Sequence, residues 1–118
     1  MKLIGLDQVR AQAWRNGGGI TRELFTWPAS GPWQLRISVA DINADGPFSA
    51  FVGVDRWFAV AEGDGVELQF GDTHHALRTG SAPLFFDGAA APGCTLLGGA
   101  TRDLNLMLRA GTRGVLQR

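Results

Sequence analysis

Short apolar or alternating segments separated by glycine-rich turns are the feature that most constrains the fold of this sequence. The central example spans residues 45–65, with a turn-rich loop, the apolar run 57–60 and a tight Gly63-Asp64-Gly65 corner. Glycine tolerates positive φ and proline fixes φ near a turn value, so Gly46-Pro47 marks a turn in this loop. The corner predicts that the chain reverses into residues 66–70, whose strict alternation is typical of a half-buried strand.

The rest of the chain repeats this pattern. Residues 71–75 predict a turn and residues 89–93 a loop, and no stretch shows a helical period over ten or more residues. Many short strands joined by tight turns are typical of an all-β sandwich or barrel, here expected to form one domain over residues 1–118. The other predicted strands cover residues 3–9, 20–27, 33–40, 76–79, 83–86, 95–97 and 103–109.

Charge, hydropathy and cysteine content exclude several classes of protein. Eleven basic and eleven acidic residues balance without a basic block, which disfavours a nucleic-acid partner. No apolar run reaches the roughly 18–20 residues of a membrane span, and the N-terminus lacks the apolar region of a signal peptide, so we expect a cytoplasmic protein without a membrane partner. Cys94 is the single cysteine, which excludes an intrachain disulfide and a cysteine-rich zinc cluster.

Two local motifs have both a structural and a functional interpretation. Asn16-Gly17-Gly18-Gly19 predicts either a bulge or corner, or a nest of backbone N–H groups that accepts an anionic or carbonyl oxygen. Asp55 and Arg56 are adjacent where a loop becomes a strand. They form either a structural ion pair or a site in which Arg56 anchors a carboxylate.

Polar residues also alternate along two predicted strands. Thr21 and Glu23 share one face of residues 20–27, and Arg36 and Ser38 share one face of residues 33–40. On a sandwich these faces contact water, whereas on a barrel they line the lumen, and the pattern alone leaves both open. His74 and His75 are the only histidines, and adjacent residues on an extended segment cannot easily hold one metal.

The Gly63-Asp64-Gly65 corner after an apolar strand is similar to the first half of a cupin motif. Aligned on Gly63, the motif's carboxylate position falls on Asp55, and its two histidine positions fall near Ser49 and Phe51. The later histidine position falls near residues 87–89, which contain none. Because imidazoles are the usual nitrogen ligands of zinc, iron and nickel, we expect no metal and no other cofactor.

Five ordered motifs resemble the HutD/Ves family, and the likeness extends from about Trp14 to Arg109. They are Trp-Arg-Asn-Gly-Gly-Gly-Ile-Thr-Arg-Glu at 14–23, Leu-Arg-Ile-Ser-Val-Ala at 35–40, Asp-Gly-Pro-Phe-Ser at 45–49, Gly-Val-Asp-Arg at 53–56 and Asp-Leu-Asn-Leu-Met at 103–107.

The resemblance implies a fold, a function and a site. The fold is a cupin-like antiparallel β-barrel or sandwich, related to the jelly roll and without metal. The implied function is that of a binding or sensor protein for a small carboxylate-bearing, anionic metabolite, within a family that includes a proposed governor of histidine utilisation and a stress-induced protein. Urocanate and formylglutamate are the family's suggested ligands. The residues that match the family motifs, and from which we expect the ligand site to be built, are Asn16, Gly17, Gly18, Gly19, Thr21, Glu23, Arg36, Ser49, Asp55, Arg56, Asp103 and Asn105.

Family members usually continue well past the Asp-x-Asn-Leu-Met motif, whereas this chain stops at Arg118. We therefore expect a homodimer in which a second copy covers the sheet edges that the longer relatives cover themselves. Two other functions stay open. One is a metal-independent isomerase or lyase with Glu23 or Asp55 as the base, and the other is a protein-interaction module that uses the loop around Phe48 and Phe51.

Overall fold

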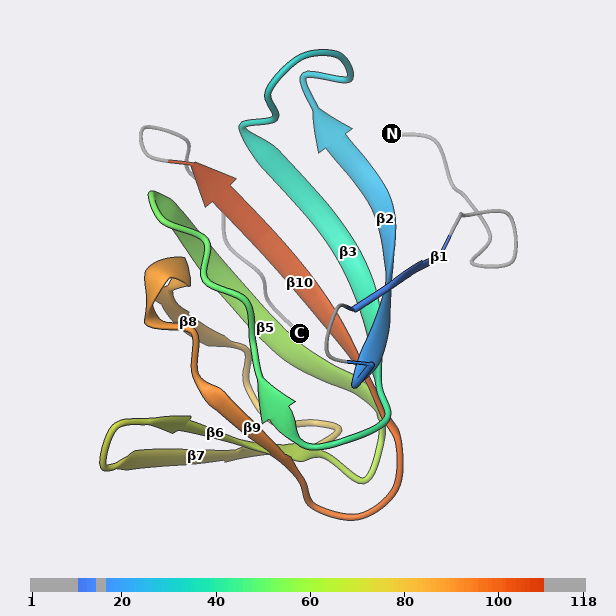
Figure 1. Cartoon of the computed structure of the whole chain (residues 1–118), viewed down its shortest axis with the longest axis vertical. Coiled ribbons are helices and arrows are strands. Elements are labelled where there is room, and N and C mark those ends of the chain that lie inside the picture. Colours follow the sequence, from blue (N-terminus) through green and yellow to red (C-terminus); the bar gives the residue numbers. More distant parts are fainter. Residues whose placement is uncertain (1–10, 15–16, 110–118) are drawn as a thin grey trace.

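The computed structural model describes residues 11–14 and 17–109, which form two antiparallel sheets (Figure 1). The larger sheet has six strands, which lie side by side in the order β1 (Ala11–Ala13), β2 (Gly19–Trp27), β3 (Leu35–Ile42), β10 (Thr101–Arg109), β5 (Val54–Gly63) and β8 (Leu84–Asp87). The smaller sheet has four, in the order β4 (Gly46–Pro47), β9 (Gly93–Leu96), β6 (Val66–Phe70) and β7 (Thr73–Leu77).

The predicted all-β class is confirmed. Apart from a 3₁₀ turn at Gly88–Ala90, the regular elements of the described residues are strands. None of the helical structure in this part of the chain is long and apolar enough to cross a membrane. The strand predicted at residues 3–9 lies outside the described residues.

The Gly63-Asp64-Gly65 corner, where the chain was predicted to reverse, does not join two paired strands. β5 and β6 do not form a hairpin, because β5 pairs with β10 and β8 while β6 pairs with β7 and β9. The corner instead carries the chain from one sheet to the other. Gly63 and Gly65 both have positive φ, at 102° and 101°, and an added Cβ on either would lie 2.5 Å from a backbone oxygen. Only glycine fits such a close approach.

Two segments predicted as turns or loops are paired strands. The turn expected at residues 71–75 ends after Asp72, because His74 and His75 belong to β7. β7 pairs with β6 in a hairpin whose connection is the two residues Gly71 and Asp72. Similarly, Gly46-Pro47 pairs with Cys94 and Gly93 of β9 instead of forming an unpaired loop.

The core lies between the two sheets. Both sheets contribute to it, with Phe58 and Val60 from β5 facing Val66 and Leu68 from β6. Cys94, a free and buried cysteine, belongs to the same cluster. Toward the other end of β5 the inward position is taken by Arg56, which is 4% exposed. The space between the sheets therefore changes along β5 from apolar to charged.

Candidate functional site

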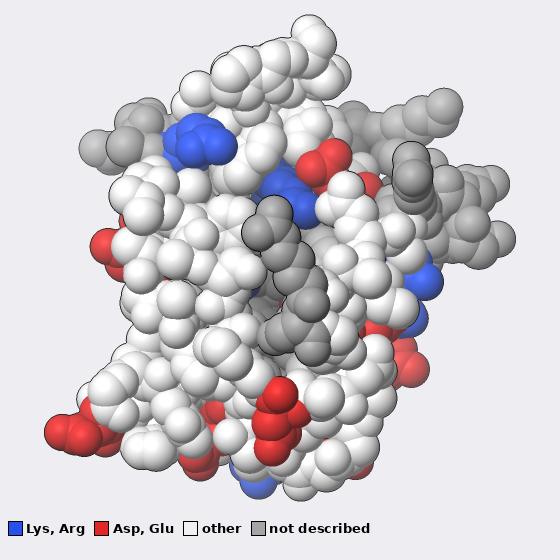
Figure 2. Space-filling view, viewed as in Figure 1, with Lys and Arg blue, Asp and Glu red and all other residues white. Residues whose placement is uncertain are grey.

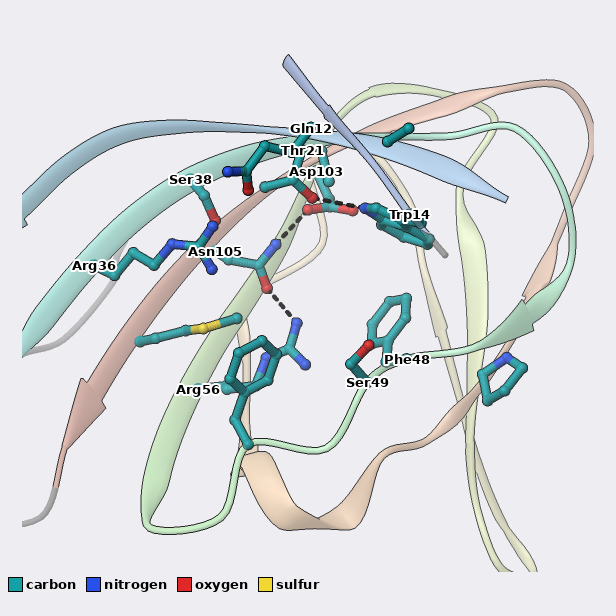
Figure 3. A pocket seen from close by; sticks show the side chains of 15 residues that line it. Gln12, Trp14, Thr21, Arg36, Ser38, Phe48, Ser49, Arg56, Asp103 and Asn105 are labelled. Carbon is teal, nitrogen blue, oxygen red and sulfur yellow. Dashed lines mark hydrogen bonds between the residues drawn. The ribbon is translucent and has the colours of Figure 1, made fainter. Parts of the chain in front are cut away.

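A cavity of about 510 Å³ occupies the polar end of the space between the sheets. Its walls come from β1, β2, β3, β4, β5 and β10, together with Trp14 after β1 and the loop that follows β4. This volume lies within the range of pockets that hold small organic ligands. The polar side chains that line the cavity include Arg36, Ser38, Arg56, Asp103 and Asn105 (Figure 3).

Arg56 is the most unusual of these residues. Its Nη2 donates a hydrogen bond to Asn105 Oδ1 at 2.8 Å, while Nε and Nη1 are buried and have no hydrogen-bond partner in the part of the chain that is described. Three phenyl rings surround the guanidinium, with centroids 5.1–5.6 Å from Cζ: those of Phe48, Phe51 and Phe86. Burial lowers the pKa of Arg56 to about 10. A cation with two unused donors therefore faces the cavity.

Asn105 connects Arg56 to a buried acid. Its Nδ2 donates to Asp103 Oδ1 at 2.5 Å, so its amide bridges the guanidinium and the carboxyl group. Asp103 is 1% exposed, and its burial raises the pKa to about 8, although the charge of Arg56 and the Asn105 hydrogen bond both oppose the rise. At neutral pH the cavity thus contains a neutral carboxyl group beside a positive guanidinium.

Arg36 places a second guanidinium on the cavity wall. The charge of Arg36 contributes to the lowered pKa of Arg56, after the larger effect of burial, so the two cations act on the same space. Arg36 Nε donates to Glu23 Oε1 at 3.1 Å, and the Glu23 side chain is 47% exposed. Glu23 therefore holds Arg36 from outside the cavity. Ser38, two residues along the same strand face, is buried beside it.

An indole from the chain segment after β1 forms another wall. Trp14 Nε1 donates to Thr21 Oγ1 at 2.7 Å, and the ring contacts Phe48 edge-on with centroids 6.2 Å apart. Gly19 allows this position, because a Cβ there would lie 2.8 Å from the Trp14 ring and 2.8 Å from Asp41 O. The glycine run thus positions Trp14 against the end of β2.

The residues expected at the ligand site divide into two groups. Six of them line the cavity, namely Thr21, Arg36, Ser49, Arg56, Asp103 and Asn105. Gly17, Gly18, Gly19, Glu23 and Asp55 are not part of its lining, and Asn16 lies outside the described residues.

The structure also bears on the alternatives left open for these motifs. The Gly18 carbonyl accepts hydrogen bonds from the backbone N–H groups of Asn43 and Ala44, which makes the glycine run a corner against β3. Asp55 is exposed while Arg56 points inward, because adjacent residues of β5 face opposite sides. Arg56 bonds to Asn105 instead of pairing with Asp55. Arg36 and Ser38 line a lumen, as on a barrel, and do not face open water.

The positions that hold metal in cupins do not fit a metal here. Among the described residues, no three His, Cys, Asp or Glu side chains are grouped as metal ligands. Ser49 and Phe51 stand at the positions aligned with histidines, and the carboxylate of Asp55 is on the exposed face of β5. His74 is exposed and its Nδ1 lies 3.0 Å from Glu67 Oε1, on the other sheet.

Several lining residues were missed from the sequence. They include Gln12, Trp14, Phe51 and Met107. Met107 lies two residues from the predicted site residue Asn105 on the same strand face, so extending the alternation from Asn105 would have found it. Trp14 and Phe51 reach the cavity only through the long-range packing of their loops.

Comparison with known proteins identifies the family. A family model described as HutD matches residues 6–117. The chain belongs to the HutD family. A 21.2 kDa protein from the hutC 3′ region of Pseudomonas putida is 36% identical over 91% of this chain and 57% of its own length. Protein Ves from Citrobacter koseri is 35% identical over 92% of this chain and 58% of its own length.

Solved structures agree with this assignment. HutD from Pseudomonas fluorescens SBW25 superposes with a TM-score of 0.81 at 33% identity, over 88% of this chain and 58% of the other. The cupin domain of Schizosaccharomyces pombe Cnp3, at 14% identity, superposes with a TM-score of 0.68 over 89% and 72% of the two chains. The fold is therefore cupin-like, as the resemblance implied. The chain spans less than two thirds of the HutD and Ves relatives that it matches.

Proposed function

We propose that this HutD-family protein is a non-catalytic binding or sensor protein for a small carboxylate-bearing metabolite. One observation carries the proposal: in a cavity of about 510 Å³, the buried Arg56 has two N–H donors, at Nε and Nη1, with no partner among the described residues. A buried donor without a partner costs about 1–3 kcal/mol, so a ligand that accepts from both recovers that energy on binding.

The chemistry of the guanidinium supports a carboxylate. Carboxylate oxygens are the acceptors with which guanidinium N–H groups form their strongest hydrogen bonds. The free Nε–H and Nη1–H lie on different edges of the guanidinium, so each can donate to a separate oxygen. The rings of Phe48, Phe51 and Phe86 keep the guanidinium in a medium of low polarity, which strengthens the electrostatic attraction. Arg36 adds a second positive charge on the cavity wall.

More specifically, we propose a regulatory role in histidine utilisation, with urocanate or formylglutamate as the ligand. We also propose that the protein is a homodimer, and static light scattering that finds only monomer at micromolar concentration would contradict the dimer.

The alternative functions have less support. Glu23 and Asp55, the expected bases of an isomerase or lyase, are not part of the cavity lining, so neither is placed to take a proton from a bound substrate. Phe48 and Phe51 line the cavity, which leaves them less suited to contact a protein partner. On the face shown in Figure 2, basic and acidic side chains are mixed, with no continuous basic stripe for a nucleic acid.

A ligand screen with a matched variant tests the proposal. Thermal unfolding is followed with formate, acetate, succinate, urocanate and N-formylglutamate, because a ligand that binds the native state raises its midpoint. We expect a rise for the wild type and for Arg78→Met, which removes an exposed arginine away from the cavity. Arg56→Met should weaken binding by about 2–5 kcal/mol. Equal midpoint shifts in the two variants, or no shift in the wild type, would refute the proposal.

A further inference from the structure

The ligand cavity contains a carboxyl group that an anion-binding site would not be expected to contain. Asp103 extends inward from β10, is 1% exposed, and lines the same cavity as Arg36 and Arg56. An ionised carboxylate at this place would repel a carboxylate ligand and cancel part of the attraction of the arginines. The role of Asp103 therefore depends on whether it keeps its proton.

Groups on each of the elements packed around Asp103 influence its charge. β5 contributes Arg56, which favours the ionised form, and β10 itself contributes Asn105. β3 contributes Asp41, which disfavours ionisation, and Arg36 on the cavity wall. β2 contributes the hydroxyl of Thr21, which does not titrate in this range, and β9 contributes the thiol of Cys94, whose pKa is raised to about 12.

Burial and these groups together favour the neutral form of Asp103. Burial raises the pKa of Asp103 by more than the charge of Arg56 and the hydrogen bond from Asn105 together lower it. The pKa of Asp103 is consequently raised to about 8. In the described part of the chain, Asn105 is the hydrogen-bond partner of the carboxyl group, and it donates to Oδ1. The proton of the neutral acid is then on Oδ2, from which it can be donated to a molecule in the cavity that Asp103 lines.

We propose that Asp103 binds the anionic ligand as a neutral carboxylic acid that donates a hydrogen bond to it, so that the site releases the ligand when Asp103 ionises. The inference rests on the proposed function and deepens it in two ways. It restricts the ligand class to anions that present a hydrogen-bond acceptor to Asp103 as well as one to Arg56. It also makes binding dependent on a proton that the protein supplies.

The direction of the pH dependence follows from this arrangement. A bound anion favours the protonated acid, so the pKa of Asp103 rises further in the complex. Below pH 7 Asp103 is protonated with or without ligand, and the affinity is constant. Above about pH 8 the free protein must take up a proton to bind, and the affinity falls by up to about tenfold per pH unit.

Calorimetry with succinate between pH 6.5 and 9 measures this coupling, because succinate is mostly a dianion over this range. At pH 8.5 we expect the protein to take up between a half and one proton for each succinate bound. The number of protons is obtained by measuring how the binding heat changes with the ionisation enthalpy of the buffer. Asp103→Asn should bind with an affinity that stays level to pH 9, since its amide is always neutral. Asp72→Asn, on an exposed turn, should keep the wild-type pH profile.

The outcomes separate this inference from the proposed function. Succinate binding that is independent of pH and takes up no proton overturns the inference and leaves the proposed function standing. A fall in affinity that persists in Asp103→Asn assigns the pH dependence to another group, such as Arg56, and also overturns it. Absence of binding at pH 6.5 by formate, acetate and succinate overturns both.

A second measurement does not depend on the variant folding. The carboxyl carbons of ¹³C-labelled aspartate are titrated by NMR in the wild type, and Asp103 is assigned through the neighbouring residues of β10. We expect its midpoint near pH 8 in the free protein and a higher midpoint with saturating succinate. A midpoint near the ordinary aspartate value of 3.8, or a midpoint that succinate lowers, would overturn the inference.

Discussion

The Arg56 guanidinium and the Asn105 amide hydrogen-bond at 2.8 Å across 49 positions of sequence. Arginine can only donate, so Asn105 must turn its oxygen toward Arg56 and its nitrogen toward Asp103. The orientation of the amide is thereby fixed from both sides. Because Asn105 is on β10 and Arg56 on β5, this pair sets the position of the guanidinium relative to the cavity.

The first prediction concerns the energetics of this pair. Asn105→Leu should lower the free energy of unfolding by about 2–4 kcal/mol, since it leaves the buried charge of Arg56 with no protein hydrogen bond. Arg56→Met should be neutral or stabilise by up to about 2 kcal/mol, because it removes a buried charge. The double variant should recover most of the loss caused by Asn105→Leu. Chemical denaturation of the wild type, the two single variants and the double variant gives a double-mutant cycle. Additive changes in the free energy of unfolding would contradict the predicted coupling between Asn105 and Arg56.

The second prediction concerns stability and pH. The pKa of Asp103 is raised from 3.8 to about 8, so its favourable contribution is complete below pH 4 and is lost as pH rises toward 8. Asp103→Asn cannot ionise and should escape this loss. We expect the variant to match the wild type near pH 4 and to gain on it by roughly 1 kcal/mol per pH unit toward pH 8. Urea denaturation at several pH values measures the difference, and a constant difference would refute the assignment.

The third prediction tests the contact between Gly19 and Trp14. Gly19→Ala places a methyl group against the indole and against a backbone oxygen, each 2.8 Å away. We expect a loss of about 1–3 kcal/mol from overpacking and a shift of the Trp14 indole N–H resonance. Gly93→Ala is the control, because its nearest neighbour is the flexible Gln69 side chain at 3.4 Å. Equal effects of the two substitutions would show that Trp14 does not depend on Gly19.

The fourth prediction concerns the corner between the sheets. Thr101 Oγ1 accepts a hydrogen bond from the Gly65 N–H at 3.1 Å and is buried. Thr101→Val keeps the shape of the side chain but leaves this N–H without its acceptor, which should cost about 1–3 kcal/mol. Thr73→Val, on the exposed strand β7, should change stability by less than about 0.5 kcal/mol. Thermal unfolding that ranks the two variants equally would contradict the role of Thr101.

The strand content was predictable because alternation and glycine turns are local signals. Arg56 could be found for a related reason, since an arginine inside an apolar strand must have a partner or a ligand. Its neighbour Asp55 was predicted with it, yet two adjacent residues of one strand cannot both face the cavity. The alternation of side chains along a strand therefore excludes Asp55 from the cavity once Arg56 faces it.

Which face of a strand points inward was not predictable from the pattern. On β3 the polar residues Arg36 and Ser38 face the cavity, while the apolar Ile37 and Val39 face outward. Val39 is nevertheless 8% exposed, so the outer face of this sheet is covered as well. When both faces are covered, hydrophobicity does not distinguish them. The pairing of the Gly46-Pro47 segment with β9 is similarly a product of tertiary contacts.

Cys94 gives this protein a built-in reporter. It is the only thiol in the sequence, is 3% exposed in the core, and has a pKa raised to about 12 by burial. Because only an exposed thiolate is alkylated, iodoacetamide can modify the native protein only after β9 has opened. The alkylation rate then measures how often β9 opens, without any engineered label, and a carboxylate ligand that stabilises the folded state should slow it.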